Sequence, residues 1–484
     1  MDRRERNTER QRGDNGSTAD TKPQRLGLTV EVGMAVTLEQ SELVSRVIHD
    51  GELGSRAAAE AYIGGVCFKQ GPPTLIGAEL EWLTVQGECS ASGPSAAPRP
   101  QLTALADALG PYAPRSIAPD SAELALPGGS RVTIEPGGQI ELSSAPFADA
   151  AQLCTSLRDD ARRLRELLES RSIRTVSVAA DADRRPKRLL QLPRYRAMEQ
   201  TFGGIGPFGK LMMCNTAATQ VSLDAGADRA DVAARWTALY AIGPALLAAF
   251  ACSPALRGAP VGDWASQRMR AWLRLDNART RPPLMDWADP IRGYSRWALD
   301  VPLLCVRRPD ETGGPDLPGR GVDSAWSPPP GATFADWLSG ALDDEVGRRP
   351  DRNDLDYHLT TLFPPVRASG YLEVRYLDAQ PGDSWTVPIH VLDALMSSRA
   401  VVAEATEVAA PLAGHWLDAA RYGLADLDIR SVAVELLDLA AAHAASAEAG
   451  REIESAAERC RGGRSPAAVS AATGAGAGGP GVVS

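Results

Sequence analysis

The sequence predicts an α+β fold in which short antiparallel strands are combined with amphipathic helices. Strand-like and helix-like patterns follow one another irregularly along the 484 residues, without the repeated βαβ units that build a parallel sheet. Two runs of alternating hydrophobicity at 130–144 flank the turn Pro136-Gly137-Gly138, which is typical of a β-hairpin. These observations favour antiparallel hairpins over a doubly wound sheet.

Four segments are predicted to be strands, and three are predicted to be helices. The strands are 75–85 (LIGAELEWLTV), 130–144 (SRVTIEPGGQIELSS), 215–224 (NTAATQVSLD) and 369–378 (SGYLEVRYLD). The helices are 149–170, 228–250 and 430–460. Within 149–170, leucines recur at helical spacing among charged residues, so this helix should have one apolar face.

The composition predicts one central domain between two tails. Residues 1–30 are polar and charged and are expected to be disordered. Residues 461–484 are rich in Gly and Ala and are expected to be flexible. The segment 31–460 shows no repeat and no long linker, so it is interpreted as a single domain with surface loops at 90–100 and 307–321.

The overall charge and the apolar segments exclude several classes of partner. A net charge of -10 argues against binding to nucleic acid, whose phosphates require a basic surface. The N-terminus lacks the apolar run of a secretory signal, and the longest apolar stretch, 241–252, is too short to span a membrane. Seven scattered cysteines without C-x-x-C spacing favour reduced thiols over a zinc site or a disulfide framework. We therefore expect a cytoplasmic protein that is a monomer or a weak oligomer.

Three of the predicted strands carry acidic residues on one face. Residues two apart on a strand point to the same side, so the spacing in GAELEW and in YLEVR places the charged side chains together. In the hairpin, the polar set alternates with Val132, Ile134, Ile140 and Leu142. The carboxylates concerned are Glu79 and Glu81, Glu135 and Glu141, and Glu373, which shares its face with Arg375.

Two interpretations of these carboxylates remain open at this point. They could be the solvated faces of ordinary strands, and Glu135 could be a structural turn residue. Alternatively, clustered glutamates repel one another less when they bind a hard cation such as Mg²⁺, which also takes water and substrate phosphates as ligands. An arginine beside such a cluster suits phosphate or carboxylate through its bidentate fork. The combination points to metal-assisted phosphoryl chemistry on a carboxylate-lined sheet.

Six blocks of the sequence resemble, in order, segments of the glutamate–cysteine ligases of the plant and actinobacterial type. They are GAELEW, EPGGQIELSSAP, MMCNTAATQVSLD, YSRWALDVPLL, FADWLSG and HLTTLFPPVRASGYLEVR, between about residue 40 and about residue 430. The actinobacterial branch, which supplies γ-glutamylcysteine to ergothioneine synthesis, is the most similar in character. The resemblance implies a glutamine-synthetase-like, curved and mostly antiparallel sheet that forms a funnel with helices packed outside. The segment 31–460 would then be one catalytic ligase domain.

The resemblance also implies the reaction and its partners. ATP would phosphorylate the γ-carboxylate of L-glutamate in the presence of Mg²⁺, and the amine of L-cysteine would attack the resulting acyl phosphate. Such a reaction needs no protein nucleophile and depends on positioning and charge neutralisation. This explains why the sequence needs no Ser/His/Asp or Cys/His set.

Residue roles follow from the matching motifs. The implied metal ligands are Glu79, Glu81, Glu135, Glu141 and Glu373. Arg375 would be catalytic by stabilising the transferring phosphoryl group or the glutamate carboxylate. Thr216 and Gln220 would contact glutamate or nucleotide, with Gln220 and Arg375 on the nucleotide side. Arg194, Arg196 and Arg367 are candidates for binding a substrate carboxylate, and Arg196 is preferred over Arg194.

Other functions compatible with the sequence are a ligase of the same fold with another acceptor amine, and phosphoryl transfer alone, as in guanidino kinases of that fold. A non-catalytic metabolite-binding protein is a third possibility, which the presence of every matched acid disfavours. His358 could touch the site or serve as a structural hydrogen-bonding group.

The segment GGIGPFGKL at 203–211 satisfies two phosphate-loop patterns, G-x-G-x-x-G and G-x-x-x-x-G-K. However, Leu211 stands where a P-loop has Ser or Thr, and Pro207 removes an N–H from the loop. The segment is therefore predicted to be a flexible connection between the arginine segment at 194–196 and the strand that carries Thr216 and Gln220. Lys210 could still reach a phosphate.

Overall fold

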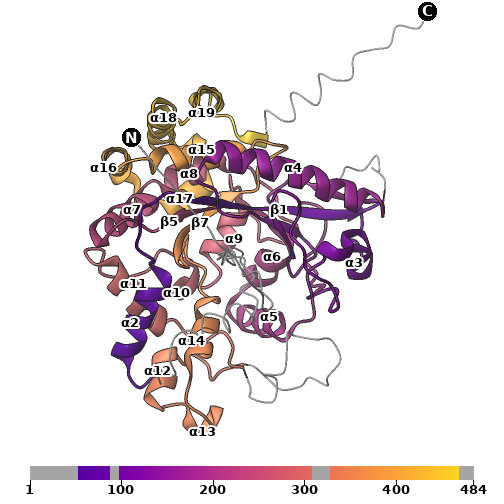
Figure 1. The fold of residues 1–484 in the computed structure, drawn as a ribbon, viewed down its shortest axis with the longest axis vertical. Coiled ribbons are helices and arrows are strands. Elements are labelled where there is room, and N and C mark those ends of the chain that lie inside the picture. Colours follow the sequence, from indigo (N-terminus) through magenta and orange to yellow (C-terminus); the bar gives the residue numbers. More distant parts are fainter. Residues whose placement is uncertain (1–52, 88–96, 308–326, 468–484) are drawn as a thin grey trace, which may run out of the picture. The chain divides into compact units, whose positions relative to one another are not determined.

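The computed structural model describes residues 53–87, 97–307 and 327–467 (Figure 1). The predicted tail at 1–30, most of the tail at 461–484 and most of the predicted loops at 90–100 and 307–321 lie outside the described residues. The chain divides into two units, Met1–Glu31 and Val32–Ser484. Every residue described below belongs to the second unit.

A seven-stranded sheet in which every strand pair is antiparallel forms the centre of this unit. Its order is β2 (Arg131–Ile134), β3 (Ile140–Ser143), β1 (Ile76–Gln86), β5 (Ala218–Asp224), β7 (Tyr371–Asp378) and β6 (Val366–Ala368), and β4 (Ile173–Val176) pairs with the far end of β1. The α+β class and the mostly antiparallel sheet are thereby confirmed. β4 and β6 were not predicted, because strands of four and three residues show little alternation and no turn such as that of the β2–β3 hairpin marks them.

One face of the sheet is apolar and is covered by helices. Leu80, Trp82, Ile140 and Leu142 point to this side and belong to the main core. The helices α4 (Ala150–Glu169), α8 (Gly243–Phe250) and α15 (Thr386–Leu395) pack here, and α18 (Leu427–Ala442) and α19 (Ala447–Arg461) lie beyond them (Figure 1). The amphipathic helix predicted at 149–170 is confirmed.

The opposite face of the sheet is polar, and three helices lie on its side: α5 (Pro193–Ile205), α6 (Phe208–Asn215) and α9 (Gln267–Leu273) (Figure 1). The other helices are α2 (Arg56–Cys67), α3 (Leu102–Leu109), α7 (Arg229–Ala241), α10 (Asn277–Thr280), α11 (Pro290–Asp300), α12 (Phe334–Ser339), α13 (Asp343–Val346), α14 (Arg352–Leu359), α16 (Arg399–Ala409) and α17 (Trp416–Tyr422). Short 3₁₀ turns occupy Gly110–Tyr112, Ala410–Leu412 and Gly423–Ala425.

Two predicted helices are each divided in the structure. The segment 228–250 forms α7 and α8, which meet at a bend of 45° where Pro244 enters the first turn of α8 without an N–H to donate. The segment 430–460 forms α18 and α19, because Ser446 starts a new helix by accepting a hydrogen bond from Ala449 N at 3.1 Å. Both predictions were right about the helical state and wrong about continuity.

Within the described ranges, no single helix is both long and apolar enough to cross a membrane; only the bent pair α7–α8, taken together, reaches that length and composition.

The prediction for 203–211 is wrong, because this segment is largely helical. α5 runs to Ile205 and α6 begins at Phe208, so only Gly206 and Pro207 connect the two helices. Gly209 lets α6 pack closely on α5, since a Cβ there would lie 2.3 Å from Phe202 Cβ. The strand predicted at 215–224 accordingly begins later, at Ala218. The rejection of a P-loop stands, because the segment follows a helix and not a strand.

The turn of the β2–β3 hairpin packs against the end of α6. A Cβ on Gly137 would lie 2.3 Å from Cys214 O and 2.6 Å from Cys214 Cα. Both neighbouring atoms are backbone and cannot move aside cheaply. The hairpin that carries Glu135 and Glu141 is therefore fixed against α6 through a glycine.

We expect Gly137→Ala to lower the free energy of unfolding by about 1–3 kcal/mol, because the added methyl group overpacks this contact. Gly203→Ala is the matched control, since nothing lies within 4 Å of its Cβ position in helix α5. The control should be neutral or slightly stabilising. Equal melting temperatures for the two variants, measured by thermal unfolding, would contradict the close contact at Gly137.

Candidate active site

The polar face of the sheet gathers the carboxylates that the sequence predicted to share a face. Glu81 on β1 lies directly opposite Glu141 on β3, and Glu79 lies opposite Gln220 on β5. Gln220 Nε2 donates to Glu79 Oε2 at 3.1 Å and to Glu81 Oε1 at 3.2 Å. Since one amide group reaches both carboxylates, the two glutamates point to the same side of β1, as predicted.

These carboxylates are buried, and hydrogen bonds from the protein satisfy only some of their oxygens. Glu141 Oε1 accepts from Thr133 Oγ1 at 2.5 Å and from Ser143 Oγ at 3.3 Å, and Glu81 Oε2 accepts from Ala218 N at 2.9 Å. Glu79 Oε1 and Glu141 Oε2 are buried and accept no hydrogen bond from the described part of the chain. A buried acceptor without a partner costs free energy, so these two oxygens mark where a positively charged ligand would be stabilised.

The proton affinities of the carboxylates reflect this crowding. Burial raises the pKa of Glu79, Glu135 and Glu141 above the usual range, and it raises the pKa of Glu81 to about 7. The neighbouring charge of Glu141 adds to the rise for Glu79, Glu81 and Glu135. A bound cation would act in the opposite direction and favour the ionised forms.

Glu373 on β7 is held differently from the other four glutamates. Its Oε2 accepts from Arg367 Nε at 2.6 Å, and its Oε1 accepts from Arg375 Nη1 at 2.7 Å. Arg367 lies directly opposite Glu373 on β6. The side chains of all three are almost fully buried. Glu373 therefore fixes two guanidinium groups beside the acidic strands.

Helix α9 adds two residues that the sequence analysis did not identify. Arg268 Nη2 donates to Arg375 O at 2.9 Å. The guanidinium carbons of Arg268 and Arg375 lie 5.4 Å and 5.3 Å from the centre of the Trp272 ring. Because α9 has only seven residues, its sequence shows no periodic pattern that could have revealed this arrangement.

Among the other predicted residues, Glu135 is part of the hairpin turn, and its side chain lies near the acidic face. Its backbone closes the hairpin turn, with N donating to Gln139 O at 2.9 Å and O accepting from Gly138 N at 2.8 Å. Its half-buried side chain lies close enough to Glu141 and Glu81 for their charges to raise its pKa.

The remaining candidates are spread around the acidic face. Thr216 donates its hydroxyl to Met212 O at 2.7 Å, at the end of α6. Arg194 donates to Thr360 Oγ1 at 2.7 Å, whereas the side chain of Arg196 is exposed on the same helix and forms no hydrogen bond or ion pair within the described residues. Lys210 pairs with Glu199 at 2.6 Å. His358 Nε2 lies 2.7 Å from Ala298 O, which agrees with a structural role.

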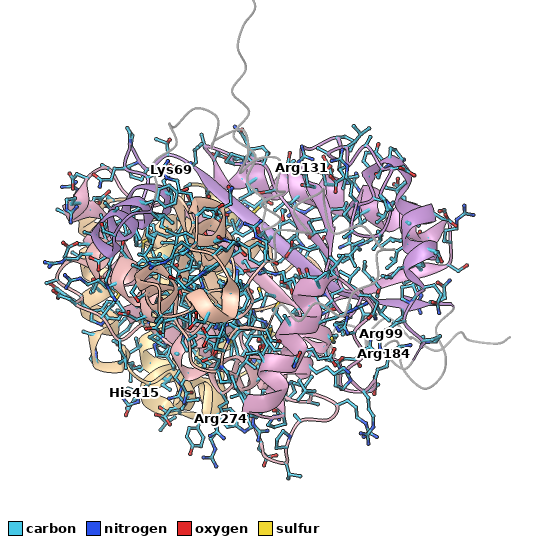
Figure 2. All side chains as sticks on the ribbon, turned by 90° about the horizontal axis from the view of Figure 1, so that it is seen from below. Lys69, Arg99, Arg131, Arg184, Arg274 and His415 are labelled. Atoms are coloured by element: carbon cyan, nitrogen blue, oxygen red, sulfur yellow. The ribbon has the colours of Figure 1, made fainter. Side chains whose placement is uncertain are left out.

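The entry of the chain into β5 is held by a buried network that also escaped sequence analysis. Arg99 and Arg184 lie close together in Figure 2, and both contact Asp181, at 3.4 Å and 2.6 Å. Arg99 Nη2 also donates to Asn215 Oδ1 at 2.7 Å. Gln139 Nε2 donates to Thr216 O at 2.9 Å from the β3 side. These bonds fix the start of the strand that carries Gln220.

The donor set of the acidic face fits a hard cation such as Mg²⁺. In the part of the chain that the structure describes, no three His, Cys, Asp or Glu side chains converge closely enough to enclose a metal by themselves. Mg²⁺ does not need such a cage, because it usually takes one or two carboxylates together with water and substrate phosphates. The buried oxygens Glu79 Oε1 and Glu141 Oε2 provide ligands of this kind.

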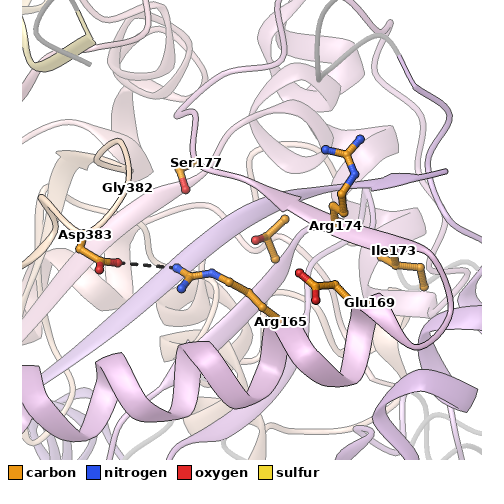
Figure 3. A pocket seen from close by; sticks show the side chains of 8 residues that line it. Arg165, Glu169, Ile173, Arg174, Ser177, Gly382 and Asp383 are labelled. Atoms are coloured by element: carbon orange, nitrogen blue, oxygen red, sulfur yellow. Dashed lines mark ion pairs between the residues drawn. The ribbon is translucent and has the colours of Figure 1, made fainter. Parts of the chain in front are cut away.

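A separate pocket of about 380 Å³ lies between the end of α4, strand β4 and the loop after β7 (Figure 3). Arg165 and Asp383 form an ion pair at 3.8 Å, and their side chains are 34% and 54% exposed. None of the residues implicated above lines this pocket. The acidic face, and not this pocket, is therefore the candidate active site.

An antiparallel sheet that buries carboxylates beside paired guanidinium groups has the chemical groups that an enzyme acting on phosphoryl groups would use. The family model of glutamate-cysteine ligase family 2 (GCS2) matches residues 75–478. The chain belongs to this family, as the sequence blocks predicted.

The chain is also similar to individual members of the family and to one solved structure. It is 37% identical over 397 residues to glutamate–cysteine ligase EgtA of Mycolicibacterium smegmatis, covering 81% of this chain and 86% of that protein. It is 35% identical over 412 residues to EgtA of Mycobacterium tuberculosis H37Rv, covering 84% and 88%. The chloroplastic glutamate–cysteine ligase of Arabidopsis thaliana is 32% identical over 258 residues, covering 52% and 46%. The solved structure of the glutamate–cysteine ligase of Francisella tularensis in complex with AMP gives a TM-score of 0.46 at 14% identity. The match covers 83% of this chain and 84% of that one.

We expect Arg367→Met to lower the free energy of unfolding by about 3 kcal/mol, because it removes one partner from a buried carboxylate. Arg461→Met is the control, since Arg461 pairs with Asp438 on the surface, where both side chains are about half exposed. The control should leave the melting temperature unchanged. Similar thermal stability of the two variants would show that Glu373 does not depend on Arg367.

Proposed function

We propose that the protein is an ATP- and Mg²⁺-dependent glutamate–cysteine ligase that joins the γ-carboxylate of L-glutamate to the amine of L-cysteine. The observation that carries the proposal is the acidic face of the sheet, where Glu79, Glu81 and Glu141 lie beside the Glu373–Arg375 pair. Membership of the glutamate–cysteine ligase family and the similarity to EgtA support the same reaction. The product γ-glutamylcysteine would serve low-molecular-weight thiol synthesis, and ergothioneine synthesis in particular.

The reaction takes place in two steps. An oxygen of the glutamate γ-carboxylate attacks the γ-phosphorus of ATP, and the bond to the leaving ADP breaks. The cysteine amine then attacks the carbonyl carbon of the γ-glutamyl phosphate, a C–N bond forms, and the C–O bond to phosphate breaks. Phosphate leaves and the amine loses a proton. Neither step requires a nucleophile from the protein, so positioning and charge neutralisation supply the catalysis.

Each group of residues has a part in this scheme. Glu79, Glu81, Glu135 and Glu141 would hold Mg²⁺, which when bound neutralises phosphate charge. Gln220 orients Glu79 and Glu81 through its two hydrogen bonds. Glu373 orients Arg367 and Arg375.

The guanidinium of Arg375 would face the transferring phosphoryl group, where an arginine fork offers several N–H donors. Arg194, Arg196 and Arg367 are candidates for binding a substrate carboxylate. Arg194 and Arg367 fit this role better than the preferred Arg196, because Arg367 is buried and Arg194 is half-buried, whereas Arg196 is exposed. Thr216 would act through its backbone position at the start of β5.

The direct test is an ADP-release assay across pairs of amino acids, with mass detection of the product. Release that requires glutamate and cysteine together, with formation of γ-glutamylcysteine, is the expected result. Equal turnover with other amines would assign a different acceptor. Release with glutamate alone would assign phosphoryl transfer without ligation.

We expect Glu81→Gln and Glu141→Gln each to lower turnover by about 10–100-fold or more, because each change removes a charged ligand while keeping the shape of the side chain. The folded state should persist, since each change also relieves repulsion between two buried carboxylates. Glu199→Gln is the control, because Glu199 pairs with Arg188 and Lys210 away from the acidic face. Wild-type turnover of Glu81→Gln and Glu141→Gln would refute the metal assignment.

The raised pKa of Glu81, about 7, gives the site a pH dependence of definite sign. Below this pH Mg²⁺ must displace a proton from Glu81, so the affinity for Mg²⁺ should rise as the pH rises through about 7. The stability of the metal-free protein should instead fall as the pH rises. A carboxyl whose folded pKa lies above its unfolded value stabilises the fold at low pH, and this stability is lost as the pH rises through about 7.

Melting temperatures measured from pH 5 to 8, with and without Mg²⁺, test both signs. Glu81→Gln should flatten the two curves. Unaltered curves in this variant would show that another group titrates in this range.

A further inference from the structure

Asp378, the last residue of β7, is the centre of a buried hydrogen-bond network behind the acidic face. Its side chain is 1% exposed. Oδ2 accepts from Cys252 N at 2.9 Å and from Ser253 Oγ at 2.7 Å, and Oδ1 accepts from Ser266 Oγ at 2.9 Å. Ser266 caps the N-terminus of α9 by accepting from Met269 N at 3.0 Å. One carboxylate therefore joins the end of β7, the segment after α8 and the start of α9.

The charged neighbour of Asp378 is Arg268 in the first turn of α9. Arg268 Nη1 lies 3.8 Å from Asp378 Oδ1, and the Arg268 side chain is 2% exposed. A guanidinium buried this deeply is costly unless a negative charge lies nearby. Glu81 also attracts Arg268 electrostatically. Arg268 thus lies between a carboxylate of the acidic face and a carboxylate behind it.

Arg268 contacts Arg375 in two ways. Its Nη2 donates to Arg375 O at 2.9 Å, and both arginines lie over the ring of Trp272. The β5–β7 register shifts between Thr219 and Val221, so the pairing of β7 with β5 is irregular beside Arg375. An irregular strand is less constrained by its ladder, and the bond from Arg268 therefore matters for the placement of Arg375.

We propose that Asp378 is a positioning residue for the ligase reaction, which it serves by holding Arg268 against Arg375. The inference rests on the proposed function, because it assigns Arg375 to the transferring phosphoryl group. Asp378 itself touches no substrate. Its charge attracts Arg268, and its bond from Ser266 holds the start of α9, while its bonds from Cys252 and Ser253 tie this point to the segment after α8.

The test is the kinetics of Asp378→Asn, which keeps the size of the side chain and removes its charge. We expect kcat per folded enzyme to fall by about 10–100-fold, as is common for residues that orient a functional group. The KM values for glutamate and cysteine should change little, because the loss lies in the transition state. An unchanged kcat would overturn the proposal.

Asp231→Asn is the matched control. Asp231 is also buried and lies 3.6 Å from the buried Arg235, but both residues belong to α7. Its bond from Ala227 N, at 2.8 Å, joins α7 to the loop before it. The control should lose thermal stability comparably and keep its kcat. An equal fall of kcat in both variants would show that Asp378 acts only through stability.

A double-mutant cycle with Arg268→Lys identifies the route. If Asp378 acts through Arg268, Asp378→Asn should cost far less in the Arg268→Lys background than in the wild type. Losses that simply multiply would contradict this route.

If Asp378→Asn does not fold, Ser253→Ala replaces it, because it removes one donor to Asp378 and leaves the charge pair in place. The substitute should lower kcat in the same direction, and a wild-type kcat would overturn the proposal. Absence of glutamate- and cysteine-dependent ADP release in the wild type would instead refute the proposed function.

Discussion

The constraint on which the site depends is the burial of like charges opposite one another on neighbouring strands. Glu81 and Glu141 face each other across the β1–β3 pair, a position where like charges destabilise a sheet. The surrounding groups compensate only in part, through the hydroxyl of Thr133 and the amide of Gln220. An arrangement that costs stability in the free protein becomes favourable when a cation binds. The buried carboxylates would thus stabilise the proposed cation more than they stabilise the free protein.

Because of the order of the strands, the charge on the polar face changes from one edge of the sheet to the other. From β3 through β1 the polar face carries Glu141, Glu81 and Glu79, and on β5 it carries the neutral Gln220. On β7 and β6 it carries Glu373 with the arginines that enclose it. A phosphate chain laid across these strands would meet cation-binding oxygens at one end and guanidinium groups at the other. Both kinds of group are required to neutralise a transferring phosphoryl group.

The parts of this arrangement that follow a local rule could be predicted from the sequence. The two-residue spacing of Glu79 and Glu81 and the Pro-Gly-Gly turn of the hairpin give the strands and their polar faces directly. The pairing of Glu81 with Glu141 depends on register between segments about 60 residues apart, and no local pattern contains it. Arg268 and Trp272 lie on a helix too short to show periodicity. The helical state of 203–215 was missed because glycines and Pro207 indicate a loop, whereas the close packing of Gly209 on Phe202 overrides this preference.

The glycine-rich segment illustrates why a phosphate site must be argued from its surroundings. A P-loop works because a strand delivers successive N–H groups to the start of a helix. Here α5 precedes the segment, and its Lys210 is held by Glu199. The negative charge of a phosphate would find no comparable set of oriented donors there. On the sheet, in contrast, the arginines are already oriented by Glu373, and unpartnered carboxylate oxygens can recruit the cation that a nucleotide brings with it. The proposed chemistry would therefore depend on side chains of antiparallel strands, where carboxylates and guanidinium groups share one face of the sheet, and not on a loop of backbone amides.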